Sequence, residues 1–324
     1  RSAAVCSHRR LFQIKKEDNM QRRSSVWKRF KQQYRLHLVM IPMALWAIVI
    51  TFVPILGNVI AFQDYSIGKG VLGSPWVGLK HFQDFLLNPY TLQLLRNTFI
   101  MSVMGLIFGT ICAVILAILI NELRSRFFQR AVQTISYIPY FISMAVCANV
   151  FLELLGRRGM VNTFFQEIGL FEEAYPFLEK EELFWIIMTI QLTWKNVGWN
   201  AIIYIAAIVG ISDEVYEAAM MDGAGRFARI WHITIPGILP TMIILLIMDS
   251  AKVLNGGMEQ QLLMYNPSVM DVAEVINTYV YKRGMGNAEY SFSTAVSMFQ
   301  SLVSIILLVT VNKIAKKTTE VALW

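Results

Sequence analysis

The sequence predicts an all-α integral membrane protein with six transmembrane helices. Apolar residues make up 56% of the 324 residues, charged residues only 16%, and the mean hydropathy is +0.49. Soluble domains are about 45–50% apolar. Six apolar runs approach the roughly 20 residues that a helix needs to cross a bilayer. Lys and Arg residues also gather in alternate connections between these runs, as in a chain that crosses a membrane repeatedly.

The six predicted spans differ in regularity, because polar residues interrupt the fourth and the fifth. In order, they are Leu38–Phe62, Thr98–Ile120, Ile135–Leu155, Phe184–Gly210, Ile238–Val253 and Ala295–Val311. The second span contains a GxxxG pair, Gly105 and Gly109, which we interpret as a site of close helix packing.

The basic residues orient the chain. Eleven Lys or Arg residues precede His37, and others follow the second, fourth and sixth spans. The link after the third span is instead acidic, from Glu167 to Glu182. By the positive-inside rule, both termini and the links after the second and fourth spans are cytoplasmic.

Three regions follow from this topology: a basic cytoplasmic tail at 1–37, a transmembrane domain at 38–311 and a basic cytoplasmic tail at 312–324. In the first tail, aromatic residues at helical spacing predict an interfacial helix, with a solvated tail as the alternative. Those residues are Trp27, Phe30 and Tyr34. The tail lacks a pattern of base-reading side chains, so membrane lipid rather than nucleic acid is the expected partner.

Motifs of catalysis and phosphate binding are missing. The sequence has no GxxxxGK[ST] loop, no HExxH and no GxSxG. Its four histidines are scattered, and its cysteines, Cys6, Cys112 and Cys147, are far apart, so neither a metal site nor a disulfide is predicted. We therefore expect no catalytic residue and no cofactor on this chain. If ATP drives the protein, another subunit must hydrolyse it.

The segment "EAAMMDGAGRFARIWHITIPGILP" is charged although it lies between two apolar runs. Ser212 is a predicted N-cap, and Gly223 is placed to end the helix that follows. "RFARIWHIT" predicts a second short helix, after which Pro236 opens the fifth span. The two helices, at 212–235, would present a face of small residues that suits docking into a groove of another protein. An ordinary cytoplasmic loop is the alternative.

This segment resembles the EAA signature of ABC importer permeases. The matching residues are Glu217, Ala218, Ala219, Asp222, Gly223, Ala224, Ile233, Pro236 and Pro240. "SPWVGLKHFQDFL", "RNTF", "WKNVGWNAIIYIAAIVGI" and "INTYVYKRG…YSFSTAVSMFQSLVS" extend the resemblance over most of the chain, toward the polysaccharide branch of carbohydrate permeases.

The resemblance implies the type I ABC importer permease fold, in a bacterial cytoplasmic (inner) membrane. It implies coupling to an ATPase through Glu217, Ala218, Ala219, Asp222, Gly223 and Ala224. The implied partners are a second permease subunit, in a heterodimer, two ATP-binding subunits that hold ATP and Mg²⁺, and an extracytoplasmic solute-binding protein. The chain lacks the large extracytoplasmic domain of the maltose importer's larger permease, so the binding-protein contacts of that domain are not carried over.

Polar residues inside the fourth and fifth spans predict a substrate path, because ionisable groups in a membrane are costly and mark function. The predicted path residues are Gln191, Trp194, Lys195, Asn196, Asn200, Asp249, Lys252 and Asn255. Amide and charged groups can bond sugar hydroxyls, and either lysine could attract a carboxylated sugar. The alternatives are that Lys195 pairs with a lipid headgroup or an acidic residue, and that Asp249 and Lys252 form an internal ion pair that holds helices together.

We thus predict the transmembrane subunit of an ATP-driven oligosaccharide importer. The two midspan lysines favour acidic fragments such as alginate, and neutral oligosaccharides are the alternative. An ion-coupled secondary transporter would be expected to show inverted repeats, and no clear repeat is visible. An exporter of glycan or lipid would work without a binding protein. A scaffold without transport would leave the midspan charges unexplained.

Overall fold

The computed structural model of the chain describes residues 33–324. It divides into a unit that ends at Val59 and a unit from Ile60 to Trp324. Between residues 33 and 324 the secondary structure is helical, and the only β-type pairing is an isolated bridge between Gln63 and Trp76. The predicted interfacial helix around Trp27 lies outside the described residues.

The described part of the first unit is a single apolar helix. It comprises α2 (Tyr34–Ala47), the π-helical η1 (Ile48–Phe52) and α3 (Val53–Gly57), and the 3₁₀ segment η2 (Asn58–Phe62) follows. No residue of α2, η1 or α3 is buried within the chain. A helix that is apolar on all sides suits lipid or another subunit, as the predicted span Leu38–Phe62 requires.

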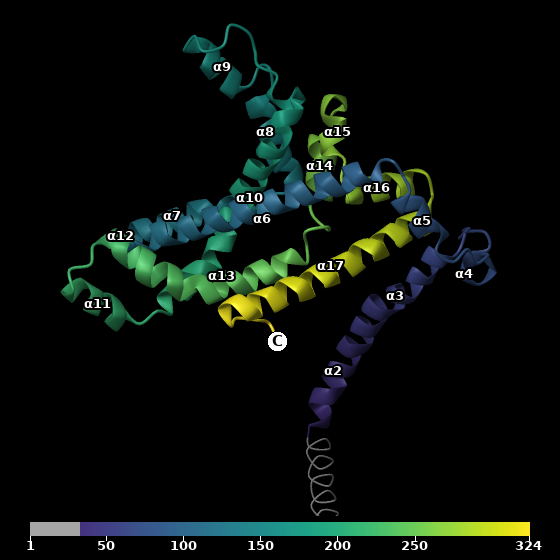
Figure 1. Cartoon of the computed structure of the whole chain (residues 1–324), viewed down its shortest axis with the longest axis horizontal. Coiled ribbons are helices and arrows are strands. Elements are labelled where there is room, and N and C mark those ends of the chain that lie inside the picture. Colours follow the sequence, from purple (N-terminus) through teal and green to yellow (C-terminus); the bar gives the residue numbers. More distant parts are fainter. Residues whose placement is uncertain (1–32) are drawn as a thin grey trace, which may run out of the picture. The chain divides into compact units, whose positions relative to one another are not determined.

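The second unit contains the remaining helices (Figure 1). They are α4 (Gly70–Gly73), α5 (Lys80–Leu86), α6 (Thr91–Asn121), α7 (Arg126–Phe141), α8 (Met144–Leu155), α9 (Met160–Glu167), α10 (Glu181–Val209), α11 (Asp213–Met221), α12 (Arg226–Arg229), α13 (Ile235–Ser250), α14 (Met258–Met264), α15 (Met270–Ala273), α16 (Ile276–Tyr281) and α17 (Tyr290–Thr319). Short 3₁₀ or π-helical segments lie between some of them: η3 (Phe177–Glu179), η4 (Ile230–Thr234), η5 (Pro267–Val269) and η6 (Lys282–Gly286).

Hydropathy supports most of the predicted spans. Four helices of the described chain are long and apolar enough to cross a membrane: Tyr34–Phe62, Thr91–Asn121, Arg226–Ser250 and Tyr290–Thr319. A bent pair, Arg126–Phe141 with Met144–Glu167, makes a fifth if it counts as one span. The helix α10 has 29 residues but is not among them, because residues such as Lys195 and Asn196 lower its hydropathy. The count of six spans therefore stays a prediction.

The third predicted span is not one helix. The structure breaks Ile135–Leu155 at Ile142 and Ser143, both with extended backbone, and α7 and α8 meet there at a bend of 100°. The Ser143 hydroxyl accepts a hydrogen bond from the Val146 amide at 3.3 Å. This serine therefore begins a new helix instead of continuing the old one. The break at Ile142 and Ser143 is called the elbow below.

One other expectation needs correction. The predicted second cytoplasmic helix is not separate, because α12, η4 and α13 form one continuous helix from Arg226 to Ser250. A π-helical turn at Ile230–Thr234 precedes Pro236, and such turns relieve the local loss of a helix hydrogen bond. The predicted C-terminal tail, 312–324, includes the end of α17, which continues to Thr319, and its cytoplasmic location stays a prediction.

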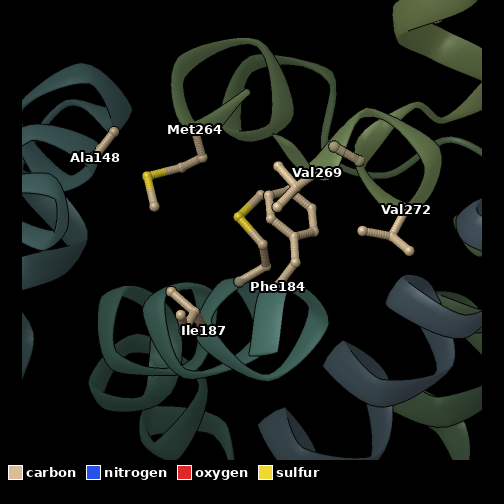
Figure 2. Packing of buried hydrophobic residues seen from close by; sticks show 8 residues of the cluster. Ala148, Phe184, Ile187, Met264, Val269 and Val272 are labelled. Atoms are coloured by element: carbon tan, nitrogen blue, oxygen red, sulfur yellow. The ribbon is translucent and has the colours of Figure 1, made fainter. Parts of the chain in front are cut away.

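The helix α10 is shared by two of the buried clusters. Near its N-terminus, Phe184 and Ile187 pack with Met264, Val269 and Val272 from the α14–α15 region, as Figure 2 shows. Farther along, a second cluster joins α6, α10 and α13 through small and branched side chains. Its members are Ala113, Val114, Ala117, Ala201, Tyr204, Ile208 and Ile238. The alanines allow close approach of α6 and α10, as small residues do between membrane helices.

A third cluster joins the N-terminal parts of α6 and α17 to α5 and α16. Its members are Phe85, Leu94, Leu254, Ile276, Phe292 and Val296. The loop after α9 is held differently, by the buried amide of Asn162. This amide donates to the carbonyls of Gly156 (2.9 Å) and Tyr175 (3.0 Å), and it accepts from the Tyr175 amide (2.8 Å).

Replacing Asn162 with leucine is expected to open the loop between α9 and α10. The substitution removes three hydrogen bonds and leaves the Tyr175 amide without its partner, which costs about 1–3 kcal/mol if the amide stays buried; the Gly156 and Tyr175 carbonyls keep the Gly159 and Phe177 amides. Limited proteolysis within residues 168–176 should become faster, and the unfolding temperature in detergent should fall. Thr163→Val is the matched control, because the Thr163 hydroxyl donates only to the Gly159 carbonyl of its own helix. Equal protease resistance of Asn162→Leu and the unmodified protein would contradict this role.

Candidate functional site

The helix α11 forms as the sequence predicts. The Ser212 hydroxyl accepts from the Glu214 amide at 3.3 Å, and Asp213 and Glu214 occupy the first turn, where the helix dipole favours them. The helix ends at Met221, and Gly223, just after the C-cap residue Asp222, stops it with a φ of +80°, a conformation that other residues rarely adopt. Both the predicted cap and the predicted stop are confirmed.

Backbone bonds close the end of α11 in a Schellman arrangement. The Gly223 amide donates to the Met220 carbonyl at 3.1 Å, and the Ala224 amide donates to the Ala219 carbonyl at 2.9 Å. These bonds satisfy carbonyls that the end of a helix leaves open. The turn into α12 therefore has a defined geometry.

Two contacts tie this region to the neighbouring long helices. The Tyr216 and Thr234 hydroxyl oxygens are 2.9 Å apart, which links α11 to η4. The Arg226 guanidinium lies 2.9 Å from the Glu122 carboxylate and donates to the Glu122 carbonyl at 3.1 Å, at the C-terminal end of α6. These contacts connect α11 to η4 and connect the start of α12 to the end of α6.

The predicted coupling residues lie together around the end of α11. Four are exposed and two are half-buried. The exposed ones are Glu217, Ala218, Asp222 and Gly223; the half-buried ones are Ala219 and Ala224. Large apolar side chains beside them are exposed too: Val215, Met220, Met221, Phe227 and Trp231. Exposed large apolar side chains beside charged ones suit contact with another protein.

A cavity of about 300 Å³ lies between α6, α10, the C-terminal end of α13 and α14. Its polar side chains come from all four regions and from both predicted path segments. They are Thr98, Ser102, Thr189, Thr193, Asn196, Asn200, Asp249, Lys252, Gln260 and Gln261. Hydroxyl and amide groups of this kind can donate to and accept from sugar hydroxyls.

The GxxxG pair of α6 lines the same cavity. A Cβ atom on Gly105 would lie 3.5 Å from the Leu192 side chain, so the packing interpretation holds at that position. A Cβ atom on Gly109 would meet nothing within 4 Å. The packing interpretation is therefore wrong for Gly109, which keeps the cavity wide.

Asp249 and Lys252 bring opposite charges to the cavity wall. The Lys252 ammonium donates to the Asp249 carboxylate at 2.8 Å. The two side chains remain 71% (Lys252) and 45% (Asp249) exposed, so the pair is accessible. The two interpretations of this pair, an internal ion pair and a group on the substrate path, are therefore compatible.

The other predicted path residues do not line the cavity. The Gln191 carbonyl oxygen accepts from the Gln260 amide at 2.8 Å, and Trp194 packs on Phe151 with ring centroids 6.0 Å apart. Lys195 donates to backbone carbonyls of α7 and the elbow. Asn255 donates to the Ser304 hydroxyl at 3.3 Å.

Sequence reasoning missed six polar residues of the cavity: Thr98, Ser102, Thr189, Thr193, Gln260 and Gln261. Two of their polar atoms, the Thr193 hydroxyl and the Gln261 carbonyl oxygen, are buried and have no hydrogen-bond partner within the described chain. Buried polar groups are normally bonded, so these two are exceptions within the cavity wall. Thr193 lies within "QLTWKNVGWN" and could have been included, whereas nothing local to Gln261 points to a path.

A family model described as a binding-protein-dependent transport system inner membrane component matches residues 105–319. The chain belongs to this family. It is therefore a membrane permease subunit of a transport system that works with a binding protein. Both the cavity wall of α10 and the α11 turn fall within the matched residues.

Named relatives cover nearly the whole chain. Protein LplB of Bacillus subtilis (strain 168) is 40% identical over 295 residues, which are 91% of this chain and 92% of LplB. The polygalacturonan/rhamnogalacturonan transport system permease protein YteP of the same organism is 39% identical over 294 residues, which are 90% and 91% of the two chains.

A solved structure shares the fold. One chain in the crystal structure of a bacterial alginate ABC transporter, in complex with an alginate pentasaccharide-bound periplasmic protein, is 32% identical. The match has a TM-score of 0.83 and covers 92% of this chain and 99% of that one. The predicted type I importer permease fold is confirmed. The assignments of coupling and path residues stay predictions.

Substitution of Gly109 by leucine is expected to block the cavity without harming the fold. The position has free space, and any change in helix propensity should favour the substitution by about 0.5–1 kcal/mol. Gly109→Leu should reach the membrane in normal amount but abolish solute uptake by the assembled transporter. Gly109→Ala is the matched control, because one methyl group fills little of the space and should preserve uptake. Normal uptake by Gly109→Leu would show that this cavity is not on the path.

Proposed function

We propose that the chain is the transmembrane subunit of an ATP-driven importer of acidic oligosaccharides, which a solute-binding protein delivers. The observation that carries the proposal is the cavity in the membrane domain, lined by amides, hydroxyls and the accessible ammonium of Lys252. Hydrogen-bonding groups around a charged residue inside a membrane suit a polar solute that carries a charge.

The choice of an anionic sugar rests on Lys252 and on the relatives. Lys252 is a lysine of the cavity wall, whereas Lys195 faces the elbow. The name of YteP gives polygalacturonan and rhamnogalacturonan, and the similar solved transporter imports the acidic polysaccharide alginate. Alginate or another sugar-acid oligomer is the cargo we favour for this chain.

The helix α11 is the proposed contact through which ATP binding and hydrolysis on partner subunits drive this chain. We expect two ATP-binding subunits to hold ATP and Mg²⁺ and to receive the exposed end of α11. Closure of those subunits displaces α11, and the Tyr216–Thr234 and Arg226–Glu122 contacts pass the displacement to the helices that wall the cavity. The cavity then opens alternately to the two sides of the membrane. A ligand-driven change of this kind requires two discrete states of the helices.

The remaining partners and the location follow from the same scheme. One chain supplies one side of a translocation path, and a second permease subunit in a heterodimer supplies the other. The Lys and Arg pattern favours cytoplasmic termini in a bacterial inner membrane. A solute-binding protein would then dock on the opposite face.

Replacing Gly223 with valine is expected to uncouple ATP hydrolysis from uptake. The φ of +80° strains a β-branched residue by about 1–3 kcal/mol, which distorts the turn after α11 but leaves the spans intact. Membrane insertion should be normal, while uptake and ATPase stimulation by the loaded binding protein should fall. Gly225→Val is the control, since Gly225 has an ordinary φ of −68° and free space around it. Normal stimulation and uptake in Gly223→Val would remove the coupling role.

Replacing Lys252 with methionine is expected to lower the uptake of uronate oligosaccharides about tenfold or more, because a hydrogen bond to a charged group contributes about 1.5–3 kcal/mol. Uptake of a neutral oligosaccharide of similar length should change little. Lys282→Met is the matched control, since Lys282 pairs with Glu274 at 2.9 Å and does not line the cavity. Equal losses for the two sugars would argue against recognition of a carboxylate by Lys252.

The most decisive experiment on the cargo uses the assembled complex. ATPase stimulation is measured with the cognate binding protein across a panel of acidic and neutral oligosaccharides. Stimulation by the acidic members supports the proposal, and stimulation by neutral sugars alone removes the preference for acids. Uptake driven by an ion gradient without ATP would instead indicate a secondary transporter.

A further inference from the structure

The elbow leaves backbone carbonyls of α7 without their helical partners. The last carbonyls of any α-helix have no amide of the same helix to accept from, and water normally donates to them instead. In the hydrocarbon of a membrane water is absent, and each carbonyl left without a donor costs several kcal/mol. Only the Pro139 carbonyl is bonded by the chain just beyond α7, from the Ile142 amide at 3.2 Å.

A single ammonium group supplies hydrogen-bond donors to carbonyls at the elbow. The Lys195 Nζ atom donates to the carbonyls of Tyr140 (2.9 Å), Ile142 and Pro139 (3.4 Å). The negative end of the α7 dipole favours a cation there. No carboxylate of the described residues pairs with Lys195, so the carbonyls provide its bonds.

Two further residues of the same face of α10 contact the end of α7. Trp199 stacks on Tyr140 with ring centroids 4.5 Å apart and an interplanar angle of 5°. Gly198 lets the two backbones touch, because a Cβ atom there would lie 2.0 Å from the Ser136 carbonyl oxygen. Lys195, Gly198 and Trp199 are called the clamp below.

The adjacent face of α10 is part of the cavity wall. Thr193, Asn196 and Asn200 line the cavity, and Asn196 and Asn200 each follow a clamp residue in the chain. Successive residues of a helix point about 100° apart, so one helix can hold the elbow with one face and touch a solute with the next. A rigid helix couples two such sites directly.

We infer that Lys195 is a positioning residue, which fixes the elbow to α10 so that α7, α8 and the cavity wall move as one body. Lys195 then acts on cargo only through the helices it holds. The clamp stands on the contacts alone, and its consequence for import rests on the proposed function.

The test compares Lys195→Met with Lys195→Arg in the complete transporter. Nitroxide labels replace Phe127 on α7 and Val150 on α8, in a background whose cysteines are changed to alanine. The clamp predicts one narrow distance distribution across the elbow in the parent protein. Lys195→Met should broaden it, and Lys195→Arg should largely restore it, since a guanidinium can also donate to several carbonyls.

Transport measurements separate positioning from cargo recognition. For Lys195→Met, uptake of acidic and neutral oligosaccharides should fall by the same factor, and the loaded binding protein should no longer stimulate the ATPase. Lys252→Met is the control, and it should leave the distance distribution narrow. An unchanged distribution in Lys195→Met, or a loss confined to acidic oligosaccharides, would overturn the inference.

Two other outcomes are also decisive. If Lys195→Met cannot be recovered from the membrane, Trp199→Leu keeps the ammonium group but loses the stacking on Tyr140. This variant should broaden the same distribution, and a narrow one would count against the clamp. If the unmodified complex imports no oligosaccharide, the proposed function fails, while the distance measurement still decides whether Lys195 holds the elbow.

Discussion

Hydrocarbon offers no hydrogen-bond partner to a peptide group, and this constraint governs where the chain can interrupt its helices. Two interruptions in the second unit have a side-chain substitute for water. At the elbow, the substitute is the Lys195 ammonium. After α13, the Gln300 amide donates to the Leu254 carbonyl at 2.7 Å. Long polar side chains thus allow a membrane domain to bend where its cavity lies.

The helix α10 has a low hydropathy because it carries many polar side chains. It carries the polar residues that cap the elbow and line the cavity, and its hydropathy is consequently too low for an ordinary span. Its remaining faces compensate by packing against α6 and against the α14–α15 region. The helix α10, which is poorly suited to lipid, therefore contributes to two of the buried clusters.

Much of the architecture could be predicted from local signals. Apolar runs located the long helices, and Ser212 and Gly223 located the ends of α11, because caps and left-handed stops depend on neighbouring residues only. The elbow was missed, since Pro139 and Ser143 occur within an apolar run that reads as one span. Gly109 was misinterpreted because a GxxxG motif shows that two residues are small, but it does not show whether another helix or a cavity lies beside them.

The two lysines show where sequence reasoning about the site ends. Lys195 and Lys252 both lie in a predicted span among polar neighbours, and nothing local separates them. Their roles differ because of which helix faces them. Successive residues of a helix point about 100° apart, so Lys195 faces α7, whereas Asn196 beside it faces the cavity. Which helix each lysine faces depends on tertiary packing, and the residues next to it in the sequence do not reveal it.

The ion pair in the cavity has a consequence for how cargo leaves. Because Asp249 already neutralises Lys252, a carboxylate that binds as proposed would exchange with Asp249 and would not meet a bare cation. The lost Asp249 pairing would offset part of the gain from the new contact, which limits how tightly the cargo is held. On release, Asp249 would pair with the ammonium again. Such an exchange lets a carrier select anions without retaining them, and an empty cavity carries no surplus charge that would collect small ions between turnovers.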